Sequence, residues 1–136
     1  MNKDVESFKV TYSTMNADRL KEFHQQFDLA LTKVKNETGN DHQNWVNGEK
    51  LESESSLEKY CPIDHSLILG KFSQASKLQT DTAIQAAQDA FVAWNLIGWK
   101  KRCELLLKAA EIIRERRYYL SAVMSLEVGK NRLEAM

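Results

Sequence analysis

The sequence predicts an α/β chain that is mostly helical, and three observations support this fold class. Apolar residues recur every three or four positions between residues 16 and 34, as they do along one side of a helix. The pair Asn47-Gly48 lies between two short strand-like runs and favours a β-hairpin, because a type I′ turn needs positive φ at both central residues. The second half of the chain has helical patterning almost throughout.

The composition is that of an ordinary globular domain, with 43% hydrophobic and 28% charged residues. The 19 basic and 19 acidic side chains cancel, so no charge excess draws the chain toward nucleic acid or a membrane surface. No apolar run approaches the roughly 20 residues of a membrane-spanning helix, and the charged N-terminus does not resemble a signal peptide. Cys61 and Cys103 are the only cysteines and lie far apart, which favours a cytoplasmic location.

The first predicted helix runs from Asn16, a good N-cap residue, to about Val34, and Gly39 follows its end. Its opposite side is polar, so this helix needs a partner for its apolar stripe. The stripe consists of Leu20, Phe23, Phe27, Leu31 and Val34.

Short strands and turns are predicted for the middle of the chain. The hairpin covers residues 43–51, and a polar connector is expected over residues 53–58. Residues 60–64 are expected to be extended or turning, because a residue before proline avoids the helical region. Residues 67–72 then form a further short strand.

Helices are predicted for most of the second half. Asp81 is expected to cap a helix that Gly98 ends, and a third helix is expected over residues 101–117. A further helix covers residues 119–127, with Gly129 in the left-handed position after it. One face of the Asp81 helix carries the small and apolar residues Ala83, Ile84, Ala87, Ala90, Phe91 and Trp94.

The end of the chain is a predicted helix start. Asn131 is a good N-cap residue, and helix-forming residues without a stop signal follow it to Met136. We therefore expect a truncated chain. Because so few strands accompany the helices, several apolar helix faces are expected to lack a partner within these residues.

The residues alone predict no catalytic or cofactor-binding site. The glycines are too far apart for a dinucleotide fingerprint or a P-loop, and the histidines are isolated from any second metal ligand. Cys61 and Cys103 are expected to serve as small packing residues, and the tryptophans to pack in a core or between domains. The residues considered are Gly39, Gly48, Gly70, Gly98 and Gly129; His24, His42 and His65; and Trp45, Trp94 and Trp99.

A series of short motifs resembles the aldehyde dehydrogenases. Residues 45–49 resemble the "I-N-G-E-W" hairpin, and residues 61–64 the "N-P-x-D/T" turn, with Cys61 replacing the asparagine. Residues 83–94 are very similar to "A-I-x-A-A-x-x-A-F-x-x-W", and residues 126–130 to "x-E-x-G-K". The remaining matches are residues 70–72, residues 102–111, and Glu134 with Ala135.

Two further segments resemble one subgroup of the aldehyde dehydrogenases. Residues 22–34 are similar to the helix before the hairpin in 1-pyrroline-5-carboxylate dehydrogenases, and residues 114–117 to an "R-x-R-R" run of that subgroup. The resemblance implies a parent enzyme that uses NAD or NADP to oxidise L-glutamate 5-semialdehyde to L-glutamate in proline catabolism. A homo-oligomer acting on a small aldehyde is implied. The alternatives are a broader-specificity aldehyde dehydrogenase and a non-catalytic helical module that binds a partner through the Phe23/Phe27/Leu31 stripe.

The resemblance also implies how the chain is divided and what it lacks. Residues 1–40 would be an N-terminal extension, residues 41–78 a hairpin and strand segment, and residues 79–136 the helical start of an NAD-binding domain. The family's nucleophilic cysteine, glutamate base and cofactor turn come later than Met136, so the chain alone is expected to be inactive. Glu127 is a hypothetical cation ligand, with the backbone near Tyr60; the alternative is a carboxylate that only makes structural hydrogen bonds.

Overall fold

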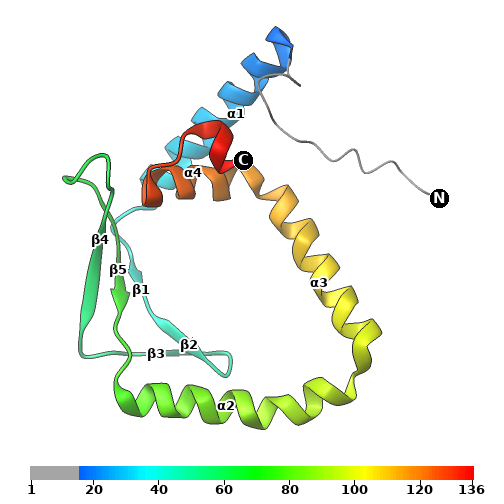
Figure 1. Cartoon of the computed structure of the whole chain (residues 1–136). Coiled ribbons are helices and arrows are strands. Elements are labelled where there is room, and N and C mark those ends of the chain that lie inside the picture. The colour runs from blue at the N-terminus through cyan, green and yellow to red at the C-terminus, as the bar shows by residue number, and fades with distance from the viewer. Residues whose placement is uncertain (1–15) are drawn as a thin grey trace.

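The computed structural model describes residues 16–136, which form five helices and five short strands. Figure 1 shows that they are arranged as an open frame. The expected absence of a signal peptide concerns residues that lie outside this described range. The elements are α1 (Ala17–Asn36), β1 (Asp41–His42), β2 (Asn44–Val46), β3 (Glu49–Leu51), β4 (Ser56–Tyr60), β5 (Ile68–Ser73), α2 (Lys77–Leu96), α3 (Gly98–Glu115), α4 (Arg117–Val128) and α5 (Arg132–Ala135).

The first helix, α1, confirms the prediction from periodicity. The side chain of Asn16 caps it by accepting a hydrogen bond from the backbone N–H of Arg19 at 2.9 Å. The stripe residues Phe23, Phe27 and Val34 are buried. Because they share one side of the helix, a single neighbouring element can cover them all.

The three-stranded sheet has β5 at its centre, with β1 parallel to it on one side and β4 antiparallel on the other. The predicted polar connector over residues 53–58 is wrong where it overlaps β4. Only Lys59 of β4 is even partly buried, so the strand has no alternation of apolar residues to mark it. It forms because its backbone pairs with β5, from Ser56 opposite Ser73 to Tyr60 opposite Ile68.

The predicted hairpin is confirmed as β2 and β3. Trp45 lies opposite Lys50, and Val46 opposite Glu49. Asn47 and Gly48 connect them with φ of 52° and 80°. This is the left-handed pair that a type I′ turn requires.

The second helix, α2, begins earlier than predicted, so the assignment of Asp81 as its N-cap is wrong. The cap is Ser76, whose hydroxyl accepts from the Gln79 N–H at 3.2 Å, while the Gln79 side chain accepts from the Ser76 N–H at 3.0 Å. This reciprocal pair is a capping box and satisfies two backbone donors at once. The Gln79 amide also donates to the Glu52 carbonyl at 2.6 Å, which ties the start of α2 to the end of the hairpin.

The remaining helices follow the sequence pattern closely. Gly98 adopts φ of 77° where α2 gives way to α3, and Gly129 adopts φ of 72° after α4. The Asn131 side chain caps α5 by accepting from the N–H groups of Leu133 and Glu134. All three positions are helix boundaries that local chemistry predicts.

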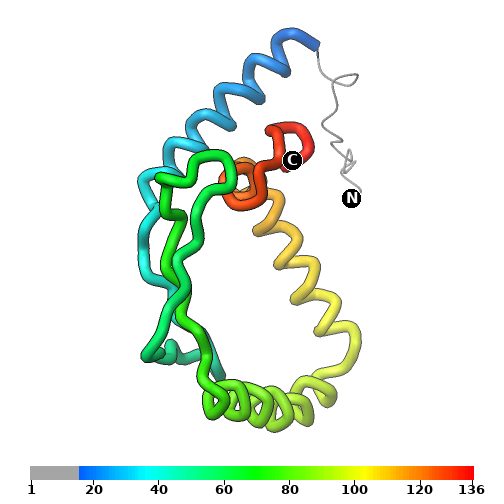
Figure 2. Tube along the Cα trace, turned by 60° about the vertical axis from the view of Figure 1, so that its left-hand side comes forward, coloured from blue at the N-terminus to red at the C-terminus, as the bar shows by residue number. Residues whose placement is uncertain are grey.

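The core lies between α1 and α4, with the sheet and α5 at its edges. Figures 1 and 2 show α1 and α4 together at one end of the frame, α2 across the opposite end, and α3 connecting α2 to α4. Neither α2 nor α3 has a buried residue, as expected for apolar helix faces without a partner. The buried core residues are Phe23, Phe27, Val34, Cys61, Ala122 and Leu126.

One expectation about packing is wrong, and another stays a prediction in part. Trp45, Trp94 and Trp99 are 64%, 46% and 65% exposed, so none of them lies in a core formed by the described residues, and packing between domains stays a prediction. Cys61 is buried as expected, but Cys103 is exposed on α3. The physical reason is the same in each case, because α2, α3 and the hairpin carry apolar side chains that the described residues do not cover.

Candidate functional site

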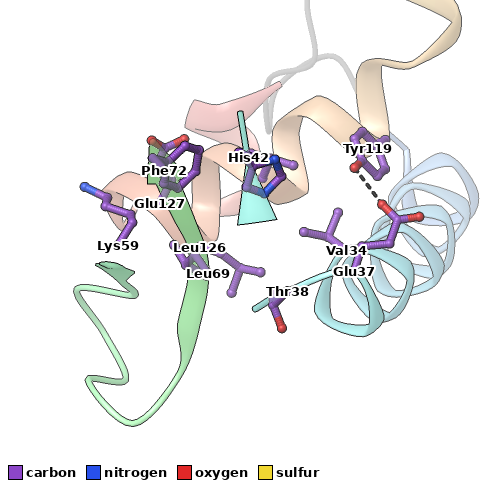
Figure 3. A pocket seen from close by; sticks show the side chains of 11 residues that line it. Val34, Glu37, Thr38, His42, Lys59, Leu69, Phe72, Tyr119, Leu126 and Glu127 are labelled. Carbon is purple, nitrogen blue, oxygen red and sulfur yellow. Dashed lines mark hydrogen bonds between the residues drawn. The ribbon is translucent and has the colours of Figure 1, made fainter. Parts of the chain in front are cut away.

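A cavity of about 280 Å³ lies where α1, α4 and the sheet meet, beside the core (Figure 3). Its floor is apolar, with Val34 of α1, Leu69 of β5 and Leu126 of α4. Polar groups from β1, β4, α4 and the loop after α1 surround this floor. They are Glu37, Thr38, His42, Lys59, Tyr119 and Glu127.

His42 reaches the cavity because a glycine lies beneath it. The imidazole stacks on the Phe72 ring, with 4.7 Å between centroids and 15° between planes. A β-carbon on Gly70 would lie 2.8 and 2.9 Å from two atoms of the His42 ring, closer than real contacts allow. The position of His42 therefore depends on Gly70 having no side chain.

On the opposite side of the cavity, the Tyr119 hydroxyl donates a hydrogen bond to the Glu37 carboxylate at 2.7 Å, drawn as a dashed line in Figure 3. This bond, together with burial, raises the pKa of Tyr119. The Arg116 guanidinium lies 5.1 Å from the centre of the tyrosine ring and the Lys33 ammonium 5.5 Å from it. The contact joins the end of α1 to the start of α4.

A second ionised cluster lies on the exposed surface of the sheet. The Tyr60 hydroxyl donates to the Glu58 carboxylate at 2.5 Å, and the Lys71 ammonium lies 3.3 Å from the same carboxylate. The bond from Tyr60 and then the bond from Lys71 lower the pKa of Glu58, and the same carboxylate raises the pKa of Tyr60. These three groups lie on the exposed surface, and Tyr60 also lines an open hollow with Cys61, Pro62 and His65.

Glu127, the hypothetical cation ligand, lies in the last turn of α4 and is exposed. It lines the same cavity as Lys59, the residue before Tyr60. Within the described part of the chain, no three histidine, cysteine, aspartate or glutamate side chains gather closely enough to hold a metal ion. Side chains alone therefore do not form a metal centre around Glu127.

The other predicted candidates lie apart from the cavity. His24 packs edge-on against Phe23, with 5.2 Å between ring centroids, and its Nδ1 lies 3.4 Å from Nη1 of Arg132. Arg132 also pairs with Asp28 at 2.6 Å, which fastens α5 to α1. Sequence patterns do not indicate this contact, because its partners are more than one hundred positions apart.

The glycine turns of the described residues do not form a glycine-rich cradle for phosphates. Positive φ occurs at four glycines in separate turns, and no two of them form a phosphate-binding loop. The cavity of about 280 Å³ is at the lower limit of ligand pockets and is too small for a dinucleotide. Among residues 16–136, every helix is too short or too polar to cross a lipid bilayer.

A model of the aldehyde dehydrogenase family matches residues 45–136, from the hairpin to α5. The chain belongs to the aldehyde dehydrogenase family. It is 36% identical to a 1-pyrroline-5-carboxylate dehydrogenase of Staphylococcus haemolyticus over 78% of this chain and 21% of the relative. A Geobacillus enzyme of the same name is 31% identical over 93% of this chain and 24% of that protein.

Solved structures of the aldehyde dehydrogenase family have the same arrangement of elements. A mutant form of the Thermus thermophilus 1-pyrroline-5-carboxylate dehydrogenase matches with a TM-score of 0.80 and 30% identity, over 99% of this chain and 24% of that one. The predicted fold class, the N-terminal part of the aldehyde dehydrogenase fold, is confirmed. The chain spans only about a fifth to a quarter of the length of these relatives.

Proposed function

We propose that this chain is the N-terminal part of an NAD(P)-dependent dehydrogenase that oxidises L-glutamate 5-semialdehyde, formed from 1-pyrroline-5-carboxylate, to L-glutamate in proline catabolism. The parent protein is a cytoplasmic homo-oligomer. Residues 1–40 are an extension of the family fold, residues 41–78 a hairpin and strand segment, and residues 79–136 the helical start of the NAD-binding domain.

The observation that supports this choice within the family is the first helix. The family model begins at residue 45, so α1 lies outside the part that aldehyde dehydrogenases share in this comparison. The likeness to the Thermus thermophilus enzyme nevertheless covers 99% of the chain, and so includes α1. Phe23 and Phe27 are only 2% and 1% exposed, so α1 contributes two buried residues to the core.

The chemistry of the parent enzyme requires a cysteine nucleophile, a base that activates water and a bound nicotinamide cofactor. In the described residues one thiol, Cys61, is 1% exposed, and the other, Cys103, is on an exposed helix. We place the catalytic thiol, the base and the site for NAD or NADP in the three-quarters of the relatives' length that the chain does not span. On this proposal the 136 residues alone oxidise no aldehyde.

Glu127 remains a proposed ligand of a cation site in the parent enzyme. The proposal rests on the family resemblance, and it is supported by the common cavity of Glu127 and Lys59. The further ligands would be backbone carbonyls near Tyr60, since Glu127 is not part of any group of three or more metal-binding side chains among the described residues. Anomalous scattering from crystals of the parent enzyme tests this proposal, and a Glu127→Gln variant that keeps the cation would disprove it.

The two alternatives differ in their support. A broader-specificity aldehyde dehydrogenase fits the family match equally well, but gives no reason for the likeness over α1. The helical interaction module needs the Phe23/Phe27/Leu31 stripe to be available to a partner. Burial of Phe23 and Phe27 against α4 removes that surface.

A pair of chimeras separates the proposed function from a broader-specificity dehydrogenase. The chain replaces the matching segment of the Thermus thermophilus enzyme in one chimera, and that of a broad-specificity aldehyde dehydrogenase lacking α1 in the other. We expect the first chimera to reduce NAD⁺ in the presence of 1-pyrroline-5-carboxylate. The second should assemble poorly, because its body comes from a protein without α1 and has to cover the unburied surfaces of α2 and α3 of a different subgroup. The isolated chain is expected to be inactive in the same assay.

A matched pair of substitutions links this result to α1. Phe23→Asp places a charge in the buried contact between α1 and α4, and should abolish assembly of the first chimera. Leu29→Asp is the control, since Leu29 is on the same helix and is 67% exposed. Activity of the isolated chain, or a well-folded first chimera that remains inactive, would refute the proposed function.

A further inference from the structure

Arg132, the first residue of α5, contacts three residues on one face of α1. Its guanidinium lies 2.6 Å from the Asp28 carboxylate, 3.4 Å from Nδ1 of His24 and 5.0 Å from the centre of the Phe27 ring. His24, Phe27 and Asp28 have the spacing i, i+3 and i+4, which makes them neighbours on a helix surface. A single side chain therefore connects the start of α5 to about one turn of α1.

The planar guanidinium suits this combination of contacts. Separate nitrogens of Arg132 face Asp28 and His24. Because arginine can only donate hydrogen bonds, the His24 nitrogen is the acceptor. The charge of the guanidinium is also attracted to the face of the Phe27 ring. A lysine ammonium is a compact point charge and would not reproduce these contacts together.

The helix α5 depends on contacts with other elements because it is very short. It has 4 residues, whereas an isolated helix of fewer than about 12 residues is marginal in water. Its end is held by α4, since the Ser121 hydroxyl donates to the Ala135 carbonyl at 2.8 Å. Leu133 packs against the core. Its start is held by the local Asn131 cap and by the contacts of Arg132 with α1.

The two helices that Arg132 connects differ in their relation to the family model. The model matches residues 45–136, which include α5, whereas α1 precedes this range. We propose that α1 controls the order of α5 through Arg132. When α1 is docked, its contacts hold residues 132–136 in one conformation, and loss of these contacts makes the segment mobile. The inference rests on contacts between described residues and does not depend on the proposed enzymatic function.

NMR order parameters of the backbone amides of residues 132–136 in the 136-residue chain test the proposal. We expect values of about 0.8 in the native chain and below about 0.6 in Arg132→Met, which keeps a long side chain but removes the charge and the planar group. Lys130→Met is the matched control. It removes one positive charge from an exposed residue two positions away, and should leave the order parameters unchanged.

A second pair of variants checks that the effect passes from α1 to α5. Asp28→Asn removes the charge at the 2.6 Å contact. It should lower the same order parameters, but by less than Arg132→Met because the contacts with His24 and Phe27 remain. Glu22→Gln changes another exposed acidic residue of α1 and should have no effect.

Three results would overturn the proposal. The first is an unchanged order of residues 132–136 in Arg132→Met, because the contacts with α4 and the core would then hold α5 without α1. The second is an equal effect of a variant and its control. The third is an equal loss of order in residues 121–126 of α4, since Arg132 would then stabilise the whole core and not α5 in particular.

Discussion

Helices α1 and α2 each have 20 residues, but their apolar residues have opposite states of burial. In α1, the stripe that contains Phe23 and Phe27 occupies one side and is closed by α4. In α2, exposed apolar residues such as Ile84, Val92 and Leu96 point in several directions, and no residue is buried. A helix with one apolar stripe is satisfied by one neighbour, whereas a helix that is apolar on several sides needs several. The difference shows which part of the chain forms its own core.

The largest expected difference in stability is that between a phenylalanine-to-alanine substitution in α1 and the same substitution in α2. Phe27→Ala removes a side chain that is 1% exposed, and should lower the free energy of unfolding by about 3–5 kcal/mol. Phe91→Ala removes one that is 62% exposed, and should change it by no more than about 0.5 kcal/mol. Urea titration followed by circular dichroism measures both. Equal losses would mean that α2 is packed within the isolated chain, and the comparison between the regions would be wrong.

Gly70→Ala probes the closed region where the sheet meets the cavity. The added methyl would overlap the His42 ring, and forcing the ring aside should cost about 1–3 kcal/mol of stability. His42→Ala removes the ring that the methyl would overlap. Gly70→Ala should therefore cost little stability when it is made in the His42→Ala variant. A double-mutant cycle by urea titration measures this coupling. If Gly70→Ala is equally harmful with and without the imidazole, the reason for the glycine lies elsewhere.

A smaller effect on stability is expected at the start of α2, where two substitutions test whether Ser76 or Asp81 is the N-cap residue. Ser76→Ala removes the acceptor for the Gln79 N–H, and should lower helix stability by about 1 kcal/mol. Asp81→Ala, at the residue that the sequence pattern favours, should have little effect because Asp81 lies inside the helix. Amide hydrogen exchange in residues 77–80 reports the difference. Greater loss of protection in the Asp81 variant would contradict the capping box.

The parts of the fold that can be predicted from the sequence depend on neighbours in the chain. Asn16 as a cap, Asn47-Gly48 as a turn and Gly129 as a helix end are set within a few residues. Ser76 and Gln79 also carry a local signal, the S-x-x-Q capping box, but the small and apolar face begins only at Ala83 and favours a later helix start.

The features that sequence patterns miss depend on residues far apart. The parallel pair of β1 and β5 joins His42 to Phe72 across thirty positions, and a two-residue strand has no periodicity to recognise. The candidate cavity has the same origin, because Glu37 meets Tyr119 only after α1 and α4 have packed. Family resemblance predicted the subgroup helix, which the likeness to the Thermus thermophilus enzyme covers, and it suggested Glu127 as a cation ligand, which stays a prediction. No local rule indicates which groups share the cavity with Glu127.

The smallest expected effect on stability is that of the hydrogen bond between Tyr119 of α4 and Glu37 at the end of α1, and this effect should depend on pH. The neutral Tyr119 hydroxyl donates to Glu37, so the folded-state pKa of Tyr119 is raised above 10.0. A raised pKa means that this contribution, about 0.5 kcal/mol, is fully present below pH ~10 and is lost as the pH rises through the folded-state value. The stability difference between the native chain and Tyr119→Phe should therefore be constant near pH 8 and shrink or reverse above pH ~10. Urea titrations at both pH values measure this difference.

Tyr60→Phe is the control for general alkaline effects, because Glu58 raises the pKa of Tyr60 but Tyr60 lies outside the contact between the helices. A Tyr119→Phe difference that stays the same across this range would show that the hydroxyl does not hold α1 to α4, and that the closed region depends on its apolar contacts alone.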